Sequence, residues 1–450
     1  MNQTQPWPRC PEAAGFFDRQ LRTFAAANPP IEAMAARFHN AAGVLLQNLI
    51  DHWILPETPG LPEELAALGL VETVLPEGDR LWKHPQARLP GVRFKRNLQA
   101  PRLALAVEDI PLFAEANGLT LTGCHGDPDS RYQCGHVALP HGELMPIARR
   151  GYGGFAPGTL SLAESQQLGH AREALHSRDR SGSALEVITR TQKLVESVIG
   201  DIGRDRAVEE FFAAERAYYM TRNRAARWQY EQQQRIGIGW ANHDHHTYRC
   251  SRDSFRALMQ LWQTLGFEMR ERFYAGAEAG WGAQILEHPV SRIILFCDLD
   301  LAPEELDIDF SRVDLAQRDT LGTIGLWCAL HGDSVGTAGL HHLEAEFDFA
   351  QEQTLLEAAG FGVMAPFTDL PMLKQAFTEA EIWPVAPERV EALRARGLIT
   401  AGQAERFLAQ GAAGSHLEIL QRWEGFKGFN KTGVSAIIQA TDARKTSQQD

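Results

Sequence analysis

The chain has 450 residues, enough for roughly two to four domains and for a core that needs no disulfide or metal to be stable. Hydrophobic residues make up 44%, charged residues 22% and aromatic residues 9%, which excludes a mainly disordered, collagenous or coiled-coil chain. Lys and Arg total 44 against 57 Asp and Glu, a net charge of -13, which disfavours nonspecific binding to nucleic acid or to anionic membranes. We therefore expect a small-molecule substrate, with no nucleic-acid or membrane partner.

Cysteine usage and the N-terminal sequence indicate the compartment. The six cysteines are scattered without a CxxC pair, which is typical of reduced thiols. The first residues, MNQTQPWPRCPEAAGFF, have neither a basic nor an apolar leader region, and no run reaches the roughly 18 apolar residues of a spanning helix. The expected location, by default, is the cytoplasm.

The N-terminal part begins with a helical pattern. Apolar residues recur at three- and four-residue steps over 12–56, around a break at Pro29-Pro30, and we assign 1–92 to a helical N-terminal region. Short strand-like runs come next at 102–107, 119–123, 132–139 and 144–149, with one short helix at 111–117. This order predicts a βαβββ-like module over 93–160.

The middle of the chain has a helix-forming composition. Residues 161–235 are rich in Ala, Glu, Gln and Arg and nearly lack Pro, with a break between Arg178 and Gly182. We expect a helical connector.

The strand-helix-strand order returns twice over 236–442. The first pass runs from NHDHHTYRC through an amphipathic helix at 253–265 to three strands, and the second begins at 336 and ends with SHLEILQR and a closing helix at 432–441. A mostly helical insertion is expected at 367–411 and a disordered tail at 443–450. The predicted class is α+β, with paired βαβββ modules forming a cupped sheet.

Three of these strands have unusually polar faces. Because alternate side chains of a strand share a face, His243, His245, Thr247 and Arg249 point one way and His246 and Tyr248 the other. The same alternation groups the following residues: His342 with Glu344 and Glu346, and His416 with Glu418, Leu420 and Arg422. Burying such faces is costly unless the side chains are hydrogen-bonded, paired or metal-bound.

Two histidines and one carboxylate form the facial triad that suits a non-heme Fe(II) centre, since it leaves positions open for substrate and dioxygen. His245, His342 and Glu418 supply these ligand types, each from the corresponding strand of its unit. His243 shares the face of His245 and would replace it after a small error in strand register.

Residues 414–442, GSHLEILQRWEGFKGFNKTGVSAIIQATD, resemble the closing segment of 4-hydroxyphenylpyruvate dioxygenase, in which a strand carries the third iron ligand, Glu. GLHHLEAEF is similar to that family's strand with the second histidine, and residues 244–267 resemble the opening unit of a vicinal-oxygen-chelate module. The resemblance implies Fe(II) held by His245, His342 and Glu418. The connector and the insertion depart from that enzyme, so its substrate is not carried over.

A second resemblance concerns the substrate. The 2-oxoadipate dioxygenase/decarboxylase family places an Arg four residues after its first iron-binding His and a Gln-Arg pair after its Glu ligand; His245 with Arg249, and Glu418 with Gln421-Arg422, repeat that spacing. The resemblance implies that Arg249 grips a substrate carboxylate by a bidentate pair. We expect Arg422 to be a structural ion-pair partner.

The expected function is an Fe(II)-dependent dioxygenase that oxidatively decarboxylates a 2-oxo acid, with dioxygen as co-substrate and a hydroxylated acid as product. Three alternatives remain open: an extradiol ring-cleaving dioxygenase, a glyoxalase-like isomerase using Zn or Ni, and a non-enzymatic small-molecule binding protein. Paired-module proteins often self-associate, but the sequence indicates no interface.

The N-terminal module carries a loose group of histidines, His125, His136 and His141. Their spacing is irregular and no carboxylate falls in a matching late strand, so we expect this module to bind no metal and to pack against the catalytic half.

Overall fold

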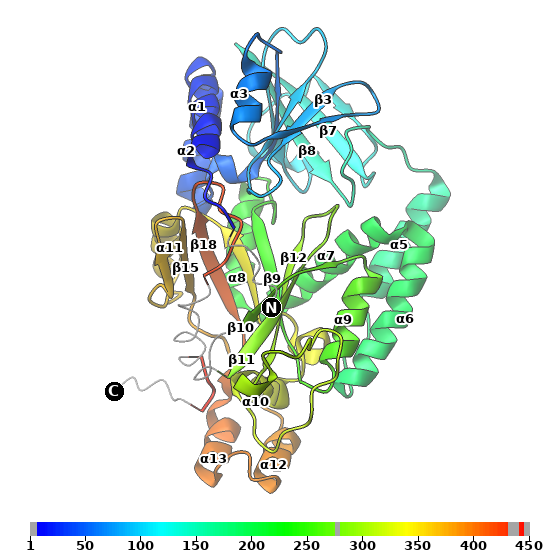
Figure 1. The fold of residues 1–450 in the computed structure, drawn as a ribbon, viewed down its shortest axis with the longest axis vertical. Helices are drawn as coiled ribbons and strands as arrows, with labels where there is room; N and C mark the ends of the chain where they lie inside the picture. Colours follow the sequence, from blue (N-terminus) through cyan, green and yellow to red (C-terminus); the bar gives the residue numbers. More distant parts are fainter. Residues whose placement is uncertain (1–6, 275–279, 431–440, 445–450) are drawn as a thin grey trace.

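The computed structural model describes residues 7–274, 280–430 and 441–444. Two eight-stranded sheets lie one above the other along the long axis, with the N-terminal sheet at the top and helices of the connector along one side (Figure 1). One apolar cluster, from Phe16 to Ile419, runs through both halves. The predicted α+β class with paired βαβββ modules is confirmed.

The C-terminal sheet contains both units predicted over 236–442. Its strand order is β10-β11-β12-β9-β13-β18-β15-β14, and the antiparallel pairing of β9 with β13 joins the two modules. The first module comprises β9 (His243–Arg249), α9 (Phe255–Thr264), β10 (Glu268–Tyr274), β11 (Trp281–Glu287) and β12 (Ile294–Asp300). The second comprises β13 (His342–Glu346), α11 (Phe349–Ala358), β14 (Thr368–Leu370), β15 (Leu373–Phe377) and β18 (His416–Arg422).

The N-terminal sheet repeats this arrangement, in the order β2-β3-β4-β1-β5-β8-β7-β6. Its first module comprises β1 (Ile50–Leu55), α3 (Leu61–Ala67), β2 (Val71–Val74), β3 (Arg80–Lys83) and β4 (Gly91–Phe94). Its second comprises β5 (Arg102–Ala106), α4 (Ile110–Ala116), β6 (Gly123–His125), β7 (Tyr132–Leu139) and β8 (Gly142–Arg149).

The structure differs here from the helical region expected over 1–92. Helices α1 (Pro11–Ala27) and α2 (Pro29–Ala42) do form, separated at Pro29, but η1 (Leu46–Leu49) leads into β1. The strands of this first module are only four to six residues long, too short for alternation to stand out from the turns between them. The single module expected over 93–160 therefore has a partner.

The connector is helical, as expected, and packs on the convex side of β9. It comprises α5 (Leu162–His176), α6 (Ala184–Ile202), α7 (Arg204–Arg222) and α8 (Arg224–Arg235). Phe212 lies against the His246 ring, with centroids 5.1 Å apart, and the Tyr248 hydroxyl donates to Glu215 at 3.1 Å. His246 and Tyr248 thus face the helices, which leaves the opposite face of β9 for the cup.

The insertion is shorter than the expected 367–411, because β14 and β15 belong to the sheet. It comprises β16 (Ile382–Trp383), α12 (Pro387–Ala395), α13 (Ala401–Gln410) and β17 (Ala412–Ala413), and its two helices project at the end opposite the N-terminal sheet (Figure 1). Between β12 and β13 lie η2 (Pro303–Glu305), α10 (Thr323–His331) and η3 (Ser334–Ala338).

Residues near both ends of the described chain make side-chain contacts with the rest of the fold. Arg444, expected in the disordered tail, pairs with Asp442 and donates to the Leu321 carbonyl at 3.1 Å. Residues 445–450 lie outside the described residues, as do residues 432–440 of the closing helix expected at 432–441. At the other end, the Trp7 indole donates to Glu271 at 3.0 Å, and Arg9 pairs with Glu424.

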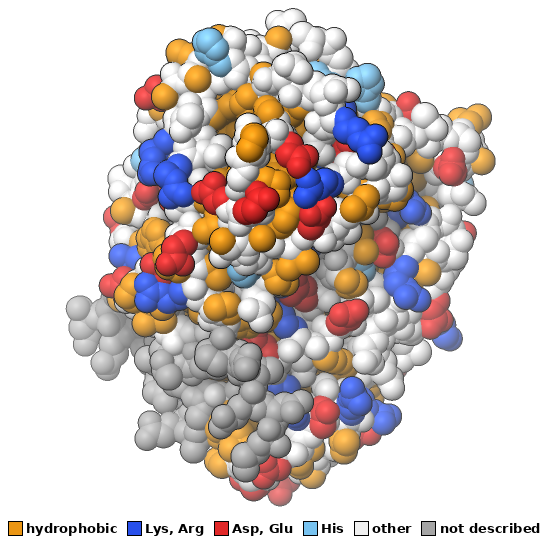
Figure 2. Space-filling model, turned by 45° about the horizontal axis from the view of Figure 1, so that its top comes forward, with side chains coloured by type: hydrophobic (Ala, Val, Ile, Leu, Met, Phe, Trp, Pro, Cys, Tyr) orange, Lys and Arg blue, Asp and Glu red, His pale blue; other side chains and the backbone are white. Residues whose placement is uncertain are grey.

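Surface properties agree with the composition. Acidic and basic side chains are interspersed over the face shown in Figure 2 rather than gathered by sign. Within the described ranges, no helix is long and apolar enough to cross a membrane.

Candidate metal centre

The structure brings His245, His342 and Glu418 together on the concave face of the C-terminal sheet. One ligand atom from each lies within 4.8 Å of the others, and all three side chains are buried. Glu418 Oε2 lies 2.9 Å from His342 Nε2 and 3.9 Å from His245 Nε2. The register explains the convergence, because β13 pairs with β9 on one side and with β18 on the other.

Both histidines are oriented through their other ring nitrogen. His245 Nδ1 lies 3.2 Å from Asp244 Oδ1 and 2.5 Å from Glu344 Oε2, while His342 Nδ1 lies 2.9 Å from His341 Nδ1. Carboxylates beside Nδ1 favour its protonation, which leaves the Nε2 lone pair of His245 directed into the cup. Burial lowers the pKa of both rings, so the neutral form that binds metals is favoured.

The donor set fits a divalent cation. Glu418 accepts a hydrogen bond from Gln375 at 3.0 Å but makes no ion pair with Lys or Arg among the described residues. Burial raises the pKa of its carboxyl, because a buried carboxylate is costly without a compensating charge. A metal between Glu418, His245 and His342 would supply that charge.

A second group of possible ligands, Asp244, His245 and Glu344, adjoins the first. Arg422 and Arg88 both pair with Asp244, at 3.0 Å each, and lower its pKa well below the usual range although burial raises it. Asp244 is thus already neutralised, and we interpret this group as the support of His245. The pairing also confirms the structural role expected of Arg422.

Aromatic rings enclose the site. Phe296 lies 4.6 Å from the His245 ring, Phe429 5.4 Å from it, and Phe377 5.0 Å from the His342 ring, measured between centroids. The cavity that they line with the three candidate ligands has a volume of about 50 Å³, enough for an ion and a few waters.

Arg249 lies on the same strand face, deeper in the fold. It is 1% exposed, and its Nε and Nη2 have no hydrogen-bond partner in the part of the chain that the structure describes. Asp298, the residue opposite it on β12, lines the cavity, and its Oδ1 also has no hydrogen-bond partner among the described residues. Burial lowers the pKa of Arg249 to about 10, although Asp298 acts against this shift. Donors left unpaired in this way are costly unless a ligand or water meets them.

The alternative ligand, His243, is directed elsewhere. A β-bulge interrupts the pairing between β13 and β9 beside it, and its Nδ1 bonds to the Trp240 carbonyl at 2.8 Å. Its ring lies 5.4 Å from that of His246, which faces the helices. The geometry therefore favours His245.

No family model and no curated protein matches the chain. Among solved structures, a mutant 4-hydroxymandelate synthase from Streptomyces coelicolor is 12% identical over 89% of this chain and 100% of its own, with a TM-score of 0.30. Methylmalonyl-CoA epimerases from Mycobacterium tuberculosis and Streptomyces coelicolor are 12% and 15% identical, over 41% and 40% of this chain and 89% and 96% of theirs, with TM-scores of 0.23 and 0.22. The function of this chain is therefore inferred from its own residues.

The corresponding cup of the N-terminal sheet is filled differently. Of its strands, β1 supplies His52, but β5 and β8 supply Ala104 and Ile147, and the Phe155 ring lies 4.9 Å from His52. Of the loose histidine group, His125 and His136 are 5.1 Å apart between ring centroids and His141 lies in an exposed turn.

Sequence reasoning missed two residues of the site, Gln375 and Asp298. Gln375 was placed in the insertion, so its contact with Glu418 could not be foreseen. Asp298 did give a signal, because it alternates with Phe296 in the otherwise apolar strand RIILFCDL.

Replacing Glu344 with Gln should lower metal affinity by about 10- to 100-fold, the usual cost of losing a carboxylate that orients a histidine ligand. Glu346→Gln is the matched control, because Glu346 lies two residues further along β13 and pairs with Arg88 instead. Titration of the metal-free protein with Fe(II) under argon measures both affinities. Equal affinities for the two variants would contradict the orienting role.

Proposed function

We propose that the chain is a non-heme Fe(II)-dependent dioxygenase that oxidatively decarboxylates a 2-oxo acid. The observation that carries this proposal is the convergence of His245, His342 and Glu418 within 4.8 Å in a buried cup. Two imidazoles and one carboxylate hold a metal from one side, which suits Fe(II) and leaves positions for a bidentate acid and dioxygen. The bound iron would supply a Lewis acid for the 2-oxo acid and electrons for the reduction of dioxygen.

The protein's own residues would bind and orient the substrate. The unpaired N–H groups of Arg249 can take a second carboxylate, or another anionic group, in a bidentate pair. Phe296, Phe377 and Phe429 would exclude water from the reacting acid. Because the cavity is about 50 Å³, an acid of several carbons must displace part of this aromatic wall on entry.

The alternatives fit the site less well. Extradiol cleavage calls for a His or Tyr base beside the substrate, and Tyr248 instead donates to Glu215 on the helical side. A glyoxalase-like isomerase is expected to use four protein ligands, whereas the candidate group here has three. The side chain of Gln375, on the neighbouring strand, bonds to Glu418 instead of adding a fourth. A binding protein would not need this donor set.

The test is anaerobic reconstitution with Fe(II) followed by a panel of 2-oxo acids. We expect a visible metal-to-ligand charge-transfer band with the substrate, bleaching of the band when oxygen is admitted, and release of carbon dioxide. The intensity of the band ranks the acids.

Each other outcome points to one alternative. One bound iron per chain without a band for any 2-oxo acid would favour catechol cleavage, or isomerisation if no dioxygen is consumed. Failure to bind any metal would favour the non-enzymatic binding protein.

A further inference from the structure

A large space lies between the two sheets, outside the cup that holds the candidate metal centre. Two cavities of about 500 and 650 Å³ share five lining residues and therefore adjoin one another. The shared residues are Asp51, Lys83, His243, Ser291 and Arg292. Volumes of this size are typical of small-molecule sites.

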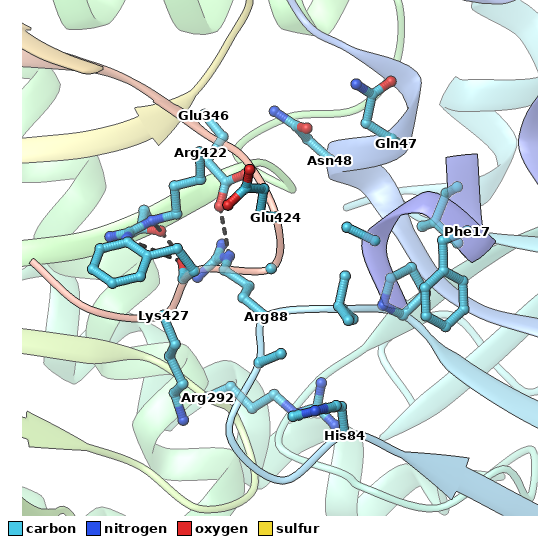
Figure 3. Close-up of a pocket in the computed structure, with 18 of the residues that line it drawn as sticks. Phe17, Gln47, Asn48, His84, Arg88, Arg292, Glu346, Arg422, Glu424 and Lys427 are labelled. Carbon is cyan, nitrogen blue, oxygen red and sulfur yellow. Dashed lines mark hydrogen bonds and ion pairs between the residues drawn. The ribbon is translucent and has the colours of Figure 1, made fainter. Parts of the chain in front are cut away.

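Most of the charged groups around the first cavity neutralise one another. Figure 3 shows Arg88 reaching toward Glu346, with Arg422 beside them and with Arg292 and Lys427 lining the same cavity; Arg88 and Arg422 both pair with Asp244. Arg88 pairs with Glu346 at 2.5 Å, and Lys427 pairs with Glu287 at 2.7 Å. These side chains form a charge-balanced wall.

Two cations on this wall have no such partner. Lys83, at the end of β3, and Arg292, in the turn between β11 and β12, make no ion pair with any described residue. The nearby carboxylate of Asp51 lines the same space, but it is paired with Arg149 at 2.8 Å. Among the described residues of this cavity, the one carboxylate without an ion pair is that of Asp18, which is exposed. Burial, and then the charge of Arg292, lower the pKa of Lys83 to about 8. Both side chains line both cavities, so the two cations share one stretch of wall.

The backbone at Arg292 adds an independent observation. Its φ is +61°, in the left-handed region that residues other than Gly, Asn and Asp rarely adopt. Such a conformation costs about 1 kcal/mol or more, and here it belongs to the tight hairpin in which the Arg292 N–H donates to the His288 carbonyl at 2.9 Å. The hairpin places Arg292 of the C-terminal sheet on the same cavity wall as Lys83 of the N-terminal sheet.

We propose that this space binds an organic anion whose carboxylate or phosphate group lies between Lys83 and Arg292 and so bridges the two sheets. An anion at that point would accept charge-assisted hydrogen bonds from both sheets. The second cavity is lined by charged and apolar side chains alike, and Val107, Ile147, Met220 and Trp240 offer apolar surface there for the remainder of the ligand.

This site is distinct from the metal centre and does not depend on the proposed function. Its wall nonetheless includes His243, two residues before His245 on β9. An occupant would therefore contact the strand that carries a candidate ligand while remaining outside the cup.

The experiment is calorimetric titration of the full, metal-free chain with phenyl phosphate, benzoate and inorganic phosphate. We expect one phenyl phosphate or benzoate per chain, bound more tightly than inorganic phosphate because the ring buries apolar surface. Lys83→Met and Arg292→Ala should each weaken binding about tenfold or more, the worth of one charge-assisted hydrogen bond. The tighter of phenyl phosphate and benzoate identifies the headgroup.

Three controls distinguish loss of this site from a general effect of charge or folding. Lys95→Ala removes an exposed lysine of the same sheet and should leave the Kd unchanged, and Lys83→Arg should retain most of the affinity. Circular dichroism verifies that each variant is folded. The site would be overturned if no probe bound at about 10 mM, or if Lys95→Ala weakened binding as much as the Lys83 and Arg292 variants do. Equal affinity for inorganic phosphate would overturn the proposal that the ligand is organic.

Discussion

Glu418→Ala is expected to abolish iron binding and to reduce iron-dependent turnover by more than about 100-fold, the upper range for loss of an outer-sphere partner alone. Glu418 supplies the only anionic atom of the three that lie within 4.8 Å. Without it, two neutral imidazoles remain to hold a divalent cation, and the affinity for Fe(II) falls with the lost charge. Metal analysis after reconstitution and oxygen-electrode assays measure the two effects.

Glu418→Gln is the companion variant, because it keeps the shape and an acceptor for the Gln375 amide, 3.0 Å away, while removing the charge. Loss of iron in both variants, with unchanged circular dichroism, assigns the effect to the carboxylate. Full iron-dependent turnover in Glu418→Ala would refute the proposed metal centre.

Arg249→Met is expected to lower kcat/KM by about 100-fold for a 2-oxo acid with a second carboxylate, which corresponds to about 3 kcal/mol of lost transition-state binding. The same change should have little effect on a 2-oxo acid without that group. Lys at this position would restore the charge but not the bidentate geometry, so Arg249→Lys should recover activity only in part.

The stability of Arg249→Met provides a second readout. Arg249 is buried with Nε and Nη2 unpartnered among the described residues, and unpaired buried donors are costly to the fold. Replacing it with a similarly shaped apolar side chain should leave the thermal midpoint unchanged or raise it. A marked fall in the midpoint, with activity lost equally for all acids, would mean that Arg249 is structural.

The strands that carry the candidate ligands could be predicted because they have polar side chains at positions where a buried strand is normally apolar. His245, His342 and Glu418 stand where a sheet normally buries Val or Leu; the strands of His245 and His342 are each followed by a helix, and Glu418 lies on the last strand of its unit. Polar residues at every second position of a strand can be recognised from a single sequence. The βαβββ order then predicts that the strands carrying them lie side by side in one sheet.

The features that escaped prediction depend on packing between distant segments. The short strands of 50–94 resemble helix ends and turns locally, and only their pairing with one another and, through β1, with β5 makes them a sheet. Gln375 contacts Glu418 across 43 positions of sequence, so its role depends on the strand neighbour rather than on spacing. The cationic pair Lys83 and Arg292 comes from different sheets and has no sequence signature.

The contacts of Trp7 have a practical bearing on how this protein is produced. The indole lies 4.4 Å from the Arg270 guanidinium, which in turn lies 5.3 Å from the Phe429 ring, and Phe429 covers His245. Three side chains, those of Trp7, Arg270 and Phe429, thus form a continuous stack that ends at His245, a candidate iron ligand. A purification tag fused ahead of Trp7 adds mass beside this stack, so a kinetic comparison of tagged and cleaved protein belongs at the start of any assay development.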